Sequence, residues 1–470
     1  RKGCVMTTRI AVIGAGVAAA AVARRVSSTF PHIELTIFDA TPPQKHLAFG
    51  HVDKRLLCNT STSVMSLDVE EPHDFAEFLG YNRRESSSVF SSRKKYGSYL
   101  QQALPSESGS CDDRLQYVLD SVICVEDSAP PVLIHTARHG LFKADFVIIT
   151  GGRKTARVPS SCQSYRDTVP VFPSPYDPSF SHWLENHPTS RIGILGTGLS
   201  AVDAARLALF EGVEAVMLSP SGQLPGVRTS LQLSAPKEIP AEEFRAHSRS
   251  VEDFRQYAIQ HATSLGWYPG RLREPLPRNG TDRFLLDYEL AENGYSVWEK
   301  MIGRMVDLAN QTWSPLKVSL RQTLLNGISD WIHRYVTAMP VQGAKNLREG
   351  FQAGSLVLAR GQGSGEQARN AVDLKDASGN SHRVEAVVCA CGYEDPGWIK
   401  HNKGIFPGQI KPNASRWVGA PLNNGWGTAQ AGNRVLFAGE AAAPTTAIPS
   451  YARTSIMQAN FALDWINSHA

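Results

Sequence analysis

One pattern near the N-terminus limits the folds open to this chain: an apolar run, a glycine-rich turn, a small-residue segment and an acid follow one another in register. Residues 9–13 form the apolar run, which predicts a buried parallel strand. Gly14 then permits a tight turn, and Gly16 lets the backbone approach a pyrophosphate. Ala19 holds the third small position, where a helix packs closely on its strand. Because the N–H groups at such a helix start attract a diphosphate, the pattern predicts a dinucleotide site.

A second predicted strand, residues 34–39, ends in the acid Asp39. Its carboxylate can accept hydrogen bonds from both hydroxyls of an adenosine ribose, which disfavours a 2′-phosphate there. A glycine turn alone would indicate only a tight strand–helix connection, and residues 10–26 alone could pass for a signal peptide. The presence of strand, glycines, helix and acid together favours a dinucleotide cradle over both alternatives.

The same pattern recurs in the middle of the chain, where residues 191–195 predict a strand that runs into Gly196 and Gly198. The next strand, residues 214–218, lacks a terminal acid, so nothing there repels a 2′-phosphate and NADPH is favoured over NADH. Further donors for this dinucleotide are expected at Ser200, Ser219, Ser221 and Arg228. One cradle is followed by a strand that ends in an acid and the other is not, which indicates FAD in the first and NADPH in the second. A chain that binds both is expected to be an oxidoreductase.

These units predict an α/β fold with two Rossmann-like dinucleotide-binding domains. Apolar strands at 144–152 and 385–392 end in glycine, and we expect the chain to cross between the domains at these turns. The stretch between the second cradle and the last strands is rich in helix formers and aromatic residues, which predicts a helical insert over the cofactor cleft. The predicted boundaries are 6–160 and 385–470 for the FAD-binding domain, 161–384 for the NAD(P)H-binding domain, and 236–344 for the insert.

Near the C-terminus, a further apolar strand ends in Gly439 and Glu440, where an acid can meet the ribityl chain of FAD. Ile448 and Pro449 precede an amphipathic segment, and Pro449 suits the first turn of a helix. The N-terminus of that helix is expected to face the N1/O2 edge of the flavin and to favour its anionic reduced form. Core packing alone is the alternative explanation for this helix.

Composition excludes several other classes of protein. The formal net charge is +4, with 48 basic and 44 acidic residues, which argues against nucleic acid as the main partner. The seven cysteines form no paired set for a metal site and no even disulfide framework, so a reducing cytoplasm is expected. A stretch of ~18 apolar residues, which a membrane span requires, does not occur. The sequence leaves open whether the protein forms a homo-oligomer.

Several segments resemble a family of FAD/NAD(P)-binding proteins related to flavin-dependent N-hydroxylating monooxygenases, including L-aspartate N-monooxygenases. Residues 57–67 (LCNTSTSVMSL) are similar to its LLNTPAxxMSL stretch, and residues 71–79 to its DPxxFxxWL continuation. Residues 92–100 resemble its PRxxYGxYL, and residues 331–340 its WxxHRxxxP. The resemblance implies a fold like that of class B flavin monooxygenases. It also implies that five residues lie near the FAD: Asn59, Met65, Ser66, Arg93 and Tyr96.

The same resemblance implies NADPH- and FAD-dependent hydroxylation of an amine or amino acid in a biosynthetic pathway. O2 is the co-substrate, and a C4a-hydroperoxyflavin delivers oxygen to the amine nitrogen. Candidate catalytic residues are Asn59, which would position the peroxide, and His51 and His333, for which a structural hydrogen bond is the alternative. Arg334 or Arg453 could pair with a substrate carboxylate, or form ordinary ion pairs.

Three other functions compete with this one. A Baeyer–Villiger or S-oxygenating enzyme shares the architecture, but residues 172–177 do not carry the FxGxxxH fingerprint. A disulfide oxidoreductase needs a cysteine pair beside the flavin, and Cys58 has no partner at CxxC or CxxxxC spacing. A flavin-binding regulator without activity is the third alternative. The sequence departs from the family pattern at three places. Ser61 stands in place of proline, and Pro220 stands where arginine often follows the second strand of the second cradle. Thr445-Thr446 replaces a Trp-Glu-like pair.

Overall fold

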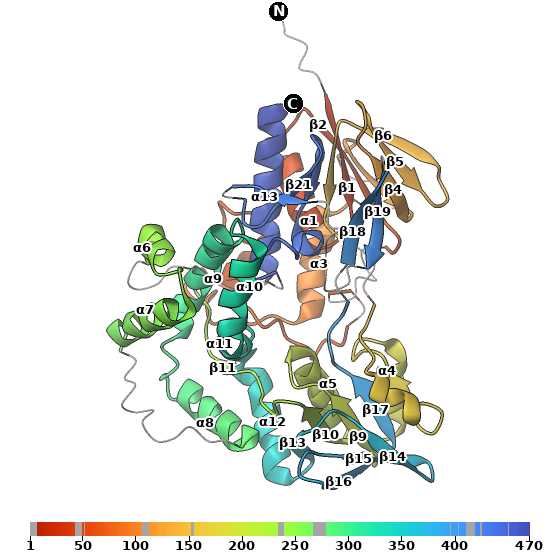
Figure 1. Ribbon diagram of the computed structural model, residues 1–470, viewed down its shortest axis with the longest axis vertical. Coiled ribbons are helices and arrows are strands. Elements are labelled where there is room, and N and C mark those ends of the chain that lie inside the picture. Colours follow the sequence, from red (N-terminus) through yellow and green to blue (C-terminus); the bar gives the residue numbers. More distant parts are fainter. Residues whose placement is uncertain are drawn as a thin grey trace, which may run out of the picture.

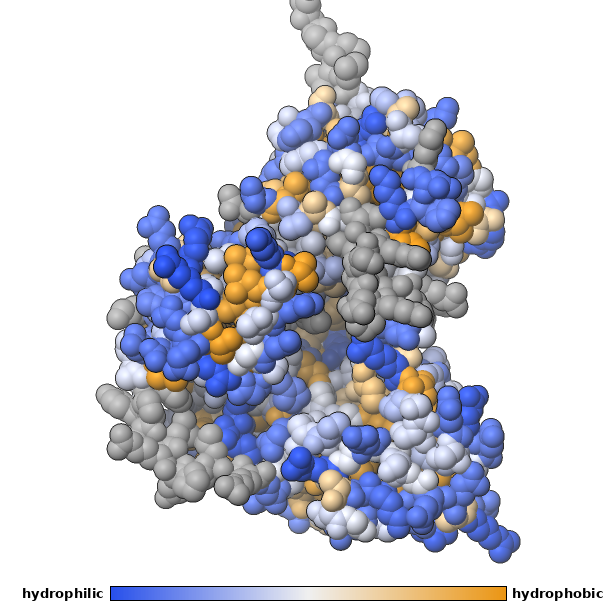
Figure 2. Space-filling view, viewed as in Figure 1, coloured by the Kyte–Doolittle hydropathy of each residue, from blue (hydrophilic) through white to orange (hydrophobic). Residues whose placement is uncertain are grey.

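A computed structural model describes residues 7–42, 49–50, 52–105, 112–151, 155–233, 239–266, 279–394, 396–402, 404–409, 419–423, 425–449 and 451–470. Within these residues the chain builds two α/β units and a group of helices (Figure 1). In that view the first unit lies at the top, the second at the bottom, and the helices on the left. The space-filling view shows the molecule hollowed between the two units (Figure 2).

The first unit is built on a seven-stranded sheet in the order β20-β21-β22-β7-β1-β2-β3. The last five strands in that order are parallel, and β20 and β21 pair antiparallel at one edge. Small side chains let α1 lie close to the sheet, and it also packs against α3 and α13. The strand bounds are β1 Thr8–Ile13, β2 Ile33–Asp39, β3 Leu115–Leu119, β7 Phe146–Ile149, β20 Ala420–Pro421, β21 Ala429–Ala431 and β22 Val435–Phe437; the helices are α1 Val17–Thr29, α2 Asp74–Phe78, α3 Arg93–Ala103 and α13 Ala452–His469.

An antiparallel sheet, β18-β19-β4-β5-β6, covers part of the first sheet. Burial alternates along β5, as expected when one face of a strand packs and the other meets solvent. Ile134 of β5 and Trp398 of β18 join Ala11 and Phe38 of the first sheet in one core. The strand bounds are β4 Val122–Glu126, β5 Val132–Thr136, β6 Leu141–Ala144, β18 Pro396–His401 and β19 Gly404–Gln409.

The second unit has a five-stranded parallel sheet in the order β13-β10-β9-β17-β8. Its helices α4, α5 and α12 contribute to a separate core, and a three-stranded antiparallel sheet, β14-β15-β16, packs beside the main sheet. The bounds are β8 Val171–Phe172, α4 Pro178–Asn186, β9 Arg191–Leu195, α5 Leu199–Phe210, β10 Glu214–Ser219, α12 Val341–Ala353, β13 Leu356–Arg360, β14 Gly365–Ala368, β15 Ala371–Lys375, β16 Ser381–Val384 and β17 Ala386–Cys389.

The predicted domain boundary at residue 385 is wrong by one strand. The prediction places β17 in the FAD-binding domain, but this strand pairs in parallel with β9, from Ala386 opposite Ile192 to Cys389 opposite Leu195. The apolar β17 completes the centre of the second sheet, and the chain returns to the first unit only with β18. The glycine turns after β7 and β17 do mark the two crossings between units, as expected.

The helical insert does not pack as a single subdomain. Its helix α8 shares the core of the second unit through Phe284 and Tyr288, whereas α9 shares the core of the first unit through Met305 and Trp313. A short parallel pair, β11 and β12, closes the base of the insert. The bounds are β11 Val227–Arg228, α6 Ala241–Ala246, α7 Val251–Ser264, α8 Gly280–Glu292, α9 Glu299–Trp313, α10 Val318–Gly327, α11 Ser329–Trp331, the π-helical turn η5 Ile332–Val336 and β12 Met339–Pro340. In the part of the chain that the structure describes, no helix combines the length and apolar character of a membrane span.

Candidate functional site

The first glycine turn is shaped so that only glycine fits at its centre. Gly14 has a φ of +103°, and a Cβ there would lie 2.9 Å from the Gly151 nitrogen. Its N–H donates to the Phe38 carbonyl at 2.7 Å, which fixes the turn between β1 and β2. The turn therefore brings the carboxyl ends of three strands, β1, β2 and β7, to one point.

The C-terminal strand β22 reaches the same edge. Gly439 has a φ of +59°, and a Cβ there would lie 3.1 Å from the Thr150 carbonyl oxygen and 3.2 Å from Ala18. Glu440 follows in the exposed first part of the 3₁₀ turn η6, Gly439–Ala442. The structure thus places Gly439 beside the first cradle with Glu440 next to it in the chain, and the contact of Glu440 with FAD stays a prediction.

The start of α1 leaves its backbone donors available for a diphosphate. Gly16 is the N-cap, and no side chain among the described residues caps the helix there. Ala19 is fully buried, which gives the close helix–strand packing that its position predicted. Asp39 accepts the Ala15 N–H at 2.8 Å, and its other oxygen accepts the Thr41 N–H at 2.9 Å. The residues of this cradle fit the adenosine diphosphate part of FAD, because they combine open helix donors with a carboxylate at the ribose position.

The second glycine turn repeats this design. Gly196 has a φ of +120°, and a Cβ there would lie 2.5 Å from the Ala390 carbonyl oxygen. Its N–H donates to the Leu218 carbonyl at 2.7 Å, matching the Gly14 bond of the first unit. Gly198 is the N-cap of α5, again without a side-chain cap among the described residues, and Ser200 lies in the first turn of that helix.

Hydroxyl groups occupy the place that Asp39 holds in the first unit. Ser219 Oγ lies 2.9 Å from Thr197 Oγ1 and 3.2 Å from Ser221 Oγ. The register of β10 and β13 pairs Ser219 with Arg360, whose Nε donates to the Pro220 carbonyl at 3.3 Å. Arg360 is exposed, and none of the described carboxylates lies within 4 Å of it in an ion pair.

Arg228 is directed away from this turn, contrary to its predicted place among the phosphate donors. Its side chain is fully buried, and Nη2 donates to the carbonyls of Tyr335 and Val336 at 2.6 and 2.8 Å. These are the last carbonyls of η5, so the guanidinium caps that turn instead of meeting the Ser219 region. Burial lowers the pKa of Arg228 to about 10, while Tyr451 and Glu299 oppose this shift. Arg360, not Arg228, is the cation beside the Ser219 turn.

The segment predicted to lie along the flavin connects three parts of the fold. Cys58 donates its N–H to the Ser91 carbonyl, and the hydroxyls of Ser61 and Ser63 donate to the Leu231 carbonyl at 2.7 and 3.1 Å. Ser61, which replaces the family's proline, thus binds the segment to the start of the insert. Met65 is buried in the core that the first unit shares with α9, and Asn59 is half-buried next to Cys58.

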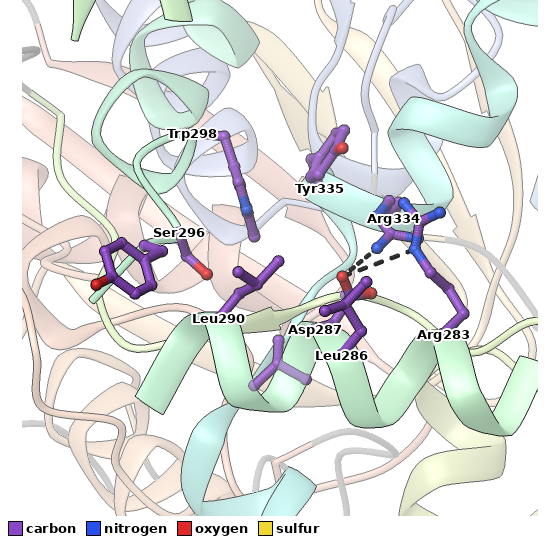
Figure 3. Close-up of a pocket in the computed structure, with 11 residues that line it drawn as sticks. Arg283, Leu286, Asp287, Leu290, Ser296, Trp298, Arg334 and Tyr335 are labelled. Atoms are coloured by element: carbon purple, nitrogen blue, oxygen red, sulfur yellow. Dashed lines mark hydrogen bonds and ion pairs between the residues drawn. The ribbon is translucent and has the colours of Figure 1, made fainter. Parts of the chain in front are cut away.

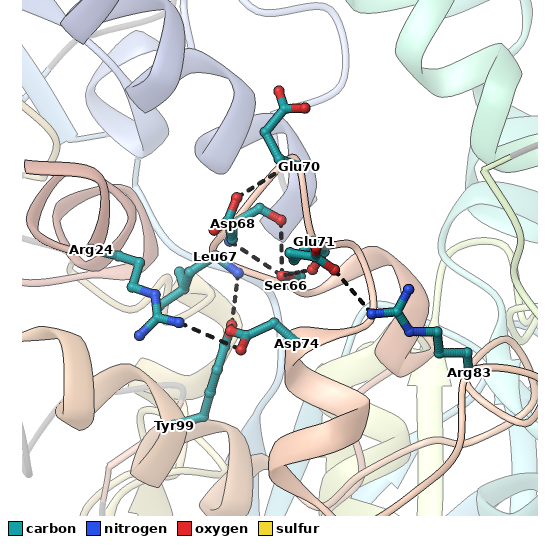
Figure 4. Close-up of polar contacts among 9 residues, drawn as sticks. All are labelled: Arg24, Ser66, Leu67, Asp68, Glu70, Glu71, Asp74, Arg83 and Tyr99. Carbon is teal, nitrogen blue, oxygen red and sulfur yellow. Dashed lines mark hydrogen bonds and ion pairs between the residues drawn. The ribbon is translucent and has the colours of Figure 1, made fainter. Parts of the chain in front are cut away.

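Ser66 and its neighbours form a polar network in the same segment (Figure 4). The Ser66 hydroxyl lies 2.7 Å from the Glu71 carbonyl oxygen and accepts the Asp68 N–H at 3.2 Å. The Leu67 N–H donates to Tyr99 Oη at 3.0 Å, and Tyr99 donates to Asp74 at 2.5 Å. These contacts assign Ser66 a role in holding its own loop, and its predicted approach to FAD stays a prediction.

Arg93 links the two units through a buried ion pair. Its Nη2 lies 2.6 Å from Asp203 of α5, with both side chains less than one-tenth exposed, and Nη1 donates to Tyr176 at 2.8 Å. Burial raises the pKa of Asp203, and Arg93 opposes that shift. Tyr96, one turn further along α3, is fully buried, and its hydroxyl has no hydrogen-bond partner among the described residues. Arg93 thus lies where the first unit contacts the second, and Tyr96 lies in the core of the first unit.

The segment before α13 differs from its predicted form. The helix begins at Ala452, so Pro449 precedes its N-cap, Tyr451, and is not in the first helical turn. The Ile448 N–H donates to Asn310 Oδ1 of α9 at 2.8 Å, which ties this segment to the insert. Sequence reasoning missed Asn310, since only the fold brings a mid-helix asparagine to this backbone.

The remaining candidate residues are two histidines and two arginines. His51 lies outside the described residues. His333 Nε2 lies 3.3 Å from the Gln223 carbonyl oxygen, in the loop that follows the Ser219 turn. Arg334 pairs with Asp287, and Arg453 Nε lies 2.9 Å from Asp307, so each has a carboxylate partner within the protein.

A comparison with protein families matches residues 11–154 to a model described as FAD-NAD(P)-binding. This match spans the first glycine turn and the strands around it. Residues 11–154 are therefore similar to an FAD-NAD(P)-binding domain. A search of curated proteins gives no match.

Solved structures share the fold over nearly the whole chain at low identity. L-lysine 6-monooxygenase from Pseudomonas syringae has a TM-score of 0.54 at 14% identity, with 98% of this chain and 99% of that chain covered. Ornithine hydroxylase from Pseudomonas aeruginosa has a TM-score of 0.51 at 13% identity, with 98% and 100% covered. OTEMO in complex with FAD and NADP has a TM-score of 0.52 at 12% identity, with 98% and 85% covered. The predicted fold, two Rossmann-type units of the flavin monooxygenase kind, is confirmed.

Proposed function

We propose that this protein is an FAD- and NADPH-dependent monooxygenase. The observation that carries the proposal is the pair of glycine turns, each leading to a helix start that no described side chain caps, and each followed by a strand with a different last residue. Asp39 at the end of β2 suits an unphosphorylated ribose, and the Ser219 hydroxyl with Arg360 suits a 2′-phosphate. Bound FAD supplies the redox chemistry with O2, and NADPH supplies the electrons.

The reaction that we propose is hydroxylation of the nitrogen of an amino acid or small amine. Two kinds of support point this way: the resemblance of residues 57–67 to N-hydroxylating enzymes, and the fold shared with lysine and ornithine hydroxylases over nearly the full chain. In this proposal the protein binds both dinucleotides at the carboxyl edges of its sheets, orients the amine and excludes water. Asn59 is the candidate group for polar contact with the reacting oxygen, and His333 for contact near the second unit.

A second candidate, Baeyer–Villiger or sulfur oxygenation, uses the same fold and the same cofactors. Which of these reactions occurs depends on the substrate that the protein binds. Enzymes with the same fold differ in the side chains of their substrate sites, so the fold does not distinguish these reactions. A disulfide reductase is less consistent with the site, because burial raises the pKa of the Cys58 thiol to about 12. A thiol with that pKa is not a nucleophile near neutral pH.

The experiment that tests the proposal is turnover by the FAD-loaded protein. NADPH oxidation and O2 consumption are followed with a panel of amino acids and amines, with a ketone and a sulfide as comparison substrates, and products are identified by mass. We expect an increase of 16 mass units on an amine nitrogen. Oxygenation of the ketone or sulfide alone would disprove N-hydroxylation and leave the monooxygenase proposal intact. A protein that takes up no flavin would disprove both.

A further inference from the structure

A pocket in the helical insert has a feature that neither dinucleotide site explains: two arginines share one buried carboxylate. Arg283 and Asp287 lie one turn apart on α8, and Arg334 approaches Asp287 from η5 (Figure 3). The arginine and aspartate side chains are only 11–16% exposed. None of the eleven lining residues belongs to either glycine turn, so the pocket is separate from the proposed cofactor sites.

The charges in this pocket do not balance. Arg334 donates to Asp287, whereas the nearest Arg283 nitrogen, Nε, lies 3.8 Å from the same carboxylate and has no hydrogen-bond partner among the described residues. Burial lowers the pKa of Arg283, and the neighbouring Arg334 lowers it further. A mostly buried guanidinium whose Nε has no acceptor is costly, so a bound anion would stabilise it.

The walls of the pocket define what kind of anion fits. Trp298, Leu286 and Leu290 supply apolar surface to the same pocket, with Trp298 and Leu290 across from the arginines (Figure 3). Tyr295, which is 54% exposed, belongs to the same lining and gives the pocket a face toward solvent. The narrow part of the pocket, about 30 Å³, holds one or two water-sized groups, so it excludes a nucleotide and admits only a carboxylate head group, and the rest of a ligand lies in the open part of the pocket.

We propose that this pocket binds the carboxylate head group of a small monocarboxylate, with its oxygens against Arg283 and Arg334 and its short apolar part in the open part of the pocket, which Trp298 and Leu290 also line. The planar guanidinium groups match the geometry of a carboxylate, and the apolar walls favour it over an inorganic anion. Asp287 competes with the ligand for the same two arginines. The inference does not depend on the proposed oxygenation.

Because Asp287 competes with the ligand, removing its charge should strengthen binding, whereas removing an arginine should weaken it. Propionate is titrated into the FAD-loaded protein and followed by calorimetry and thermal unfolding, with propionamide as the neutral analogue and chloride at equal ionic strength. We expect Arg283→Met to weaken propionate binding at least tenfold and Asp287→Asn to strengthen it severalfold. Arg255→Met, which removes an arginine on α7 outside the pocket, serves as the control and is expected to leave binding unchanged.

A role in stability alone would not reproduce this pattern, because Arg283→Met and Asp287→Asn would then both lower the unfolding temperature without changing propionate binding. If Asp287→Asn does not fold, Arg283→Met against Arg255→Met still decides. Propionate that gives no heat and no thermal shift in the wild-type protein would overturn the proposal. Equal effects of propionate and propionamide, or of propionate and chloride, would also overturn it.

Discussion

Replacing Arg360 by methionine tests the assignment of the second cradle to NADPH. Methionine keeps an apolar stem against Gly222, which packs on the Arg360 side chain, and removes the charge. A hydrogen bond to a charged group contributes about 1.5–3 kcal/mol. Because Arg360 is exposed and screened by salt, we expect the lower end of that range, or about tenfold weaker binding of NADPH.

The assay compares NADPH with NADH in the same protein. We expect KM for NADPH to rise about tenfold in Arg360→Met, and KM for NADH to stay within about twofold. Titration with 2′,5′-ADP and 5′-ADP gives the same comparison without turnover, so it stays informative if the protein oxygenates nothing. Lys375→Met, which removes another cation of the second unit, should change neither value. Equal losses for both coenzymes in Arg360→Met would refute the assignment.

Three further predictions concern the first cradle and its contact with the second unit. Gly14→Ala should give protein without bound flavin absorbance, because it combines a positive φ with a 2.9 Å backbone contact; Gly80→Ala, with a positive φ but open space, should keep its flavin. Arg93→Met should lower the free energy of unfolding in urea by about 3–5 kcal/mol, since Asp203 stays buried without its partner, whereas Arg83→Met, at an exposed side chain, should leave the urea midpoint nearly unchanged. Retained flavin in Gly14→Ala, or equal urea midpoints for the two arginine variants, would contradict these expectations. Cys58→Ser should keep full NADPH oxidation, because a thiol with a pKa of about 12 is protonated at pH 8; loss of activity without loss of flavin would favour thiol chemistry instead.

The backbone of both cradles could be predicted because local rules decide it. Gly14 and Gly196 each need a positive φ and a close approach of backbone, and these requirements appear in the sequence as a strand that runs into glycine. The error at β17 has the opposite origin. An apolar strand followed by glycine reads alike in either domain, and only pairing with β9 decides its sheet.

Side chains that reach the site from distant elements could not be predicted. Arg360 lies 141 positions after Ser219 in the chain, and only the parallel register of β10 and β13 places the two side by side. Sequence proximity suggested Arg228 instead, but the β11–β12 pair turns it into the protein interior. Tertiary packing, to which a single sequence gives little access, decided both positions.

The helical insert contributes helices to the separate cores of both units. Because α8 packs in the second core and α9 in the first, the short connection at residues 293–298 joins two separately packed bodies. A change in the angle between the units must therefore alter this connection and the Arg93–Asp203 ion pair together. Ser296 and Trp298 of the connection also line the arginine pocket, which extends from α8 to η5. A carboxylate bound there would contact both sides of the connection, so we expect it to stiffen the same junction between the units that the Arg93–Asp203 ion pair crosses.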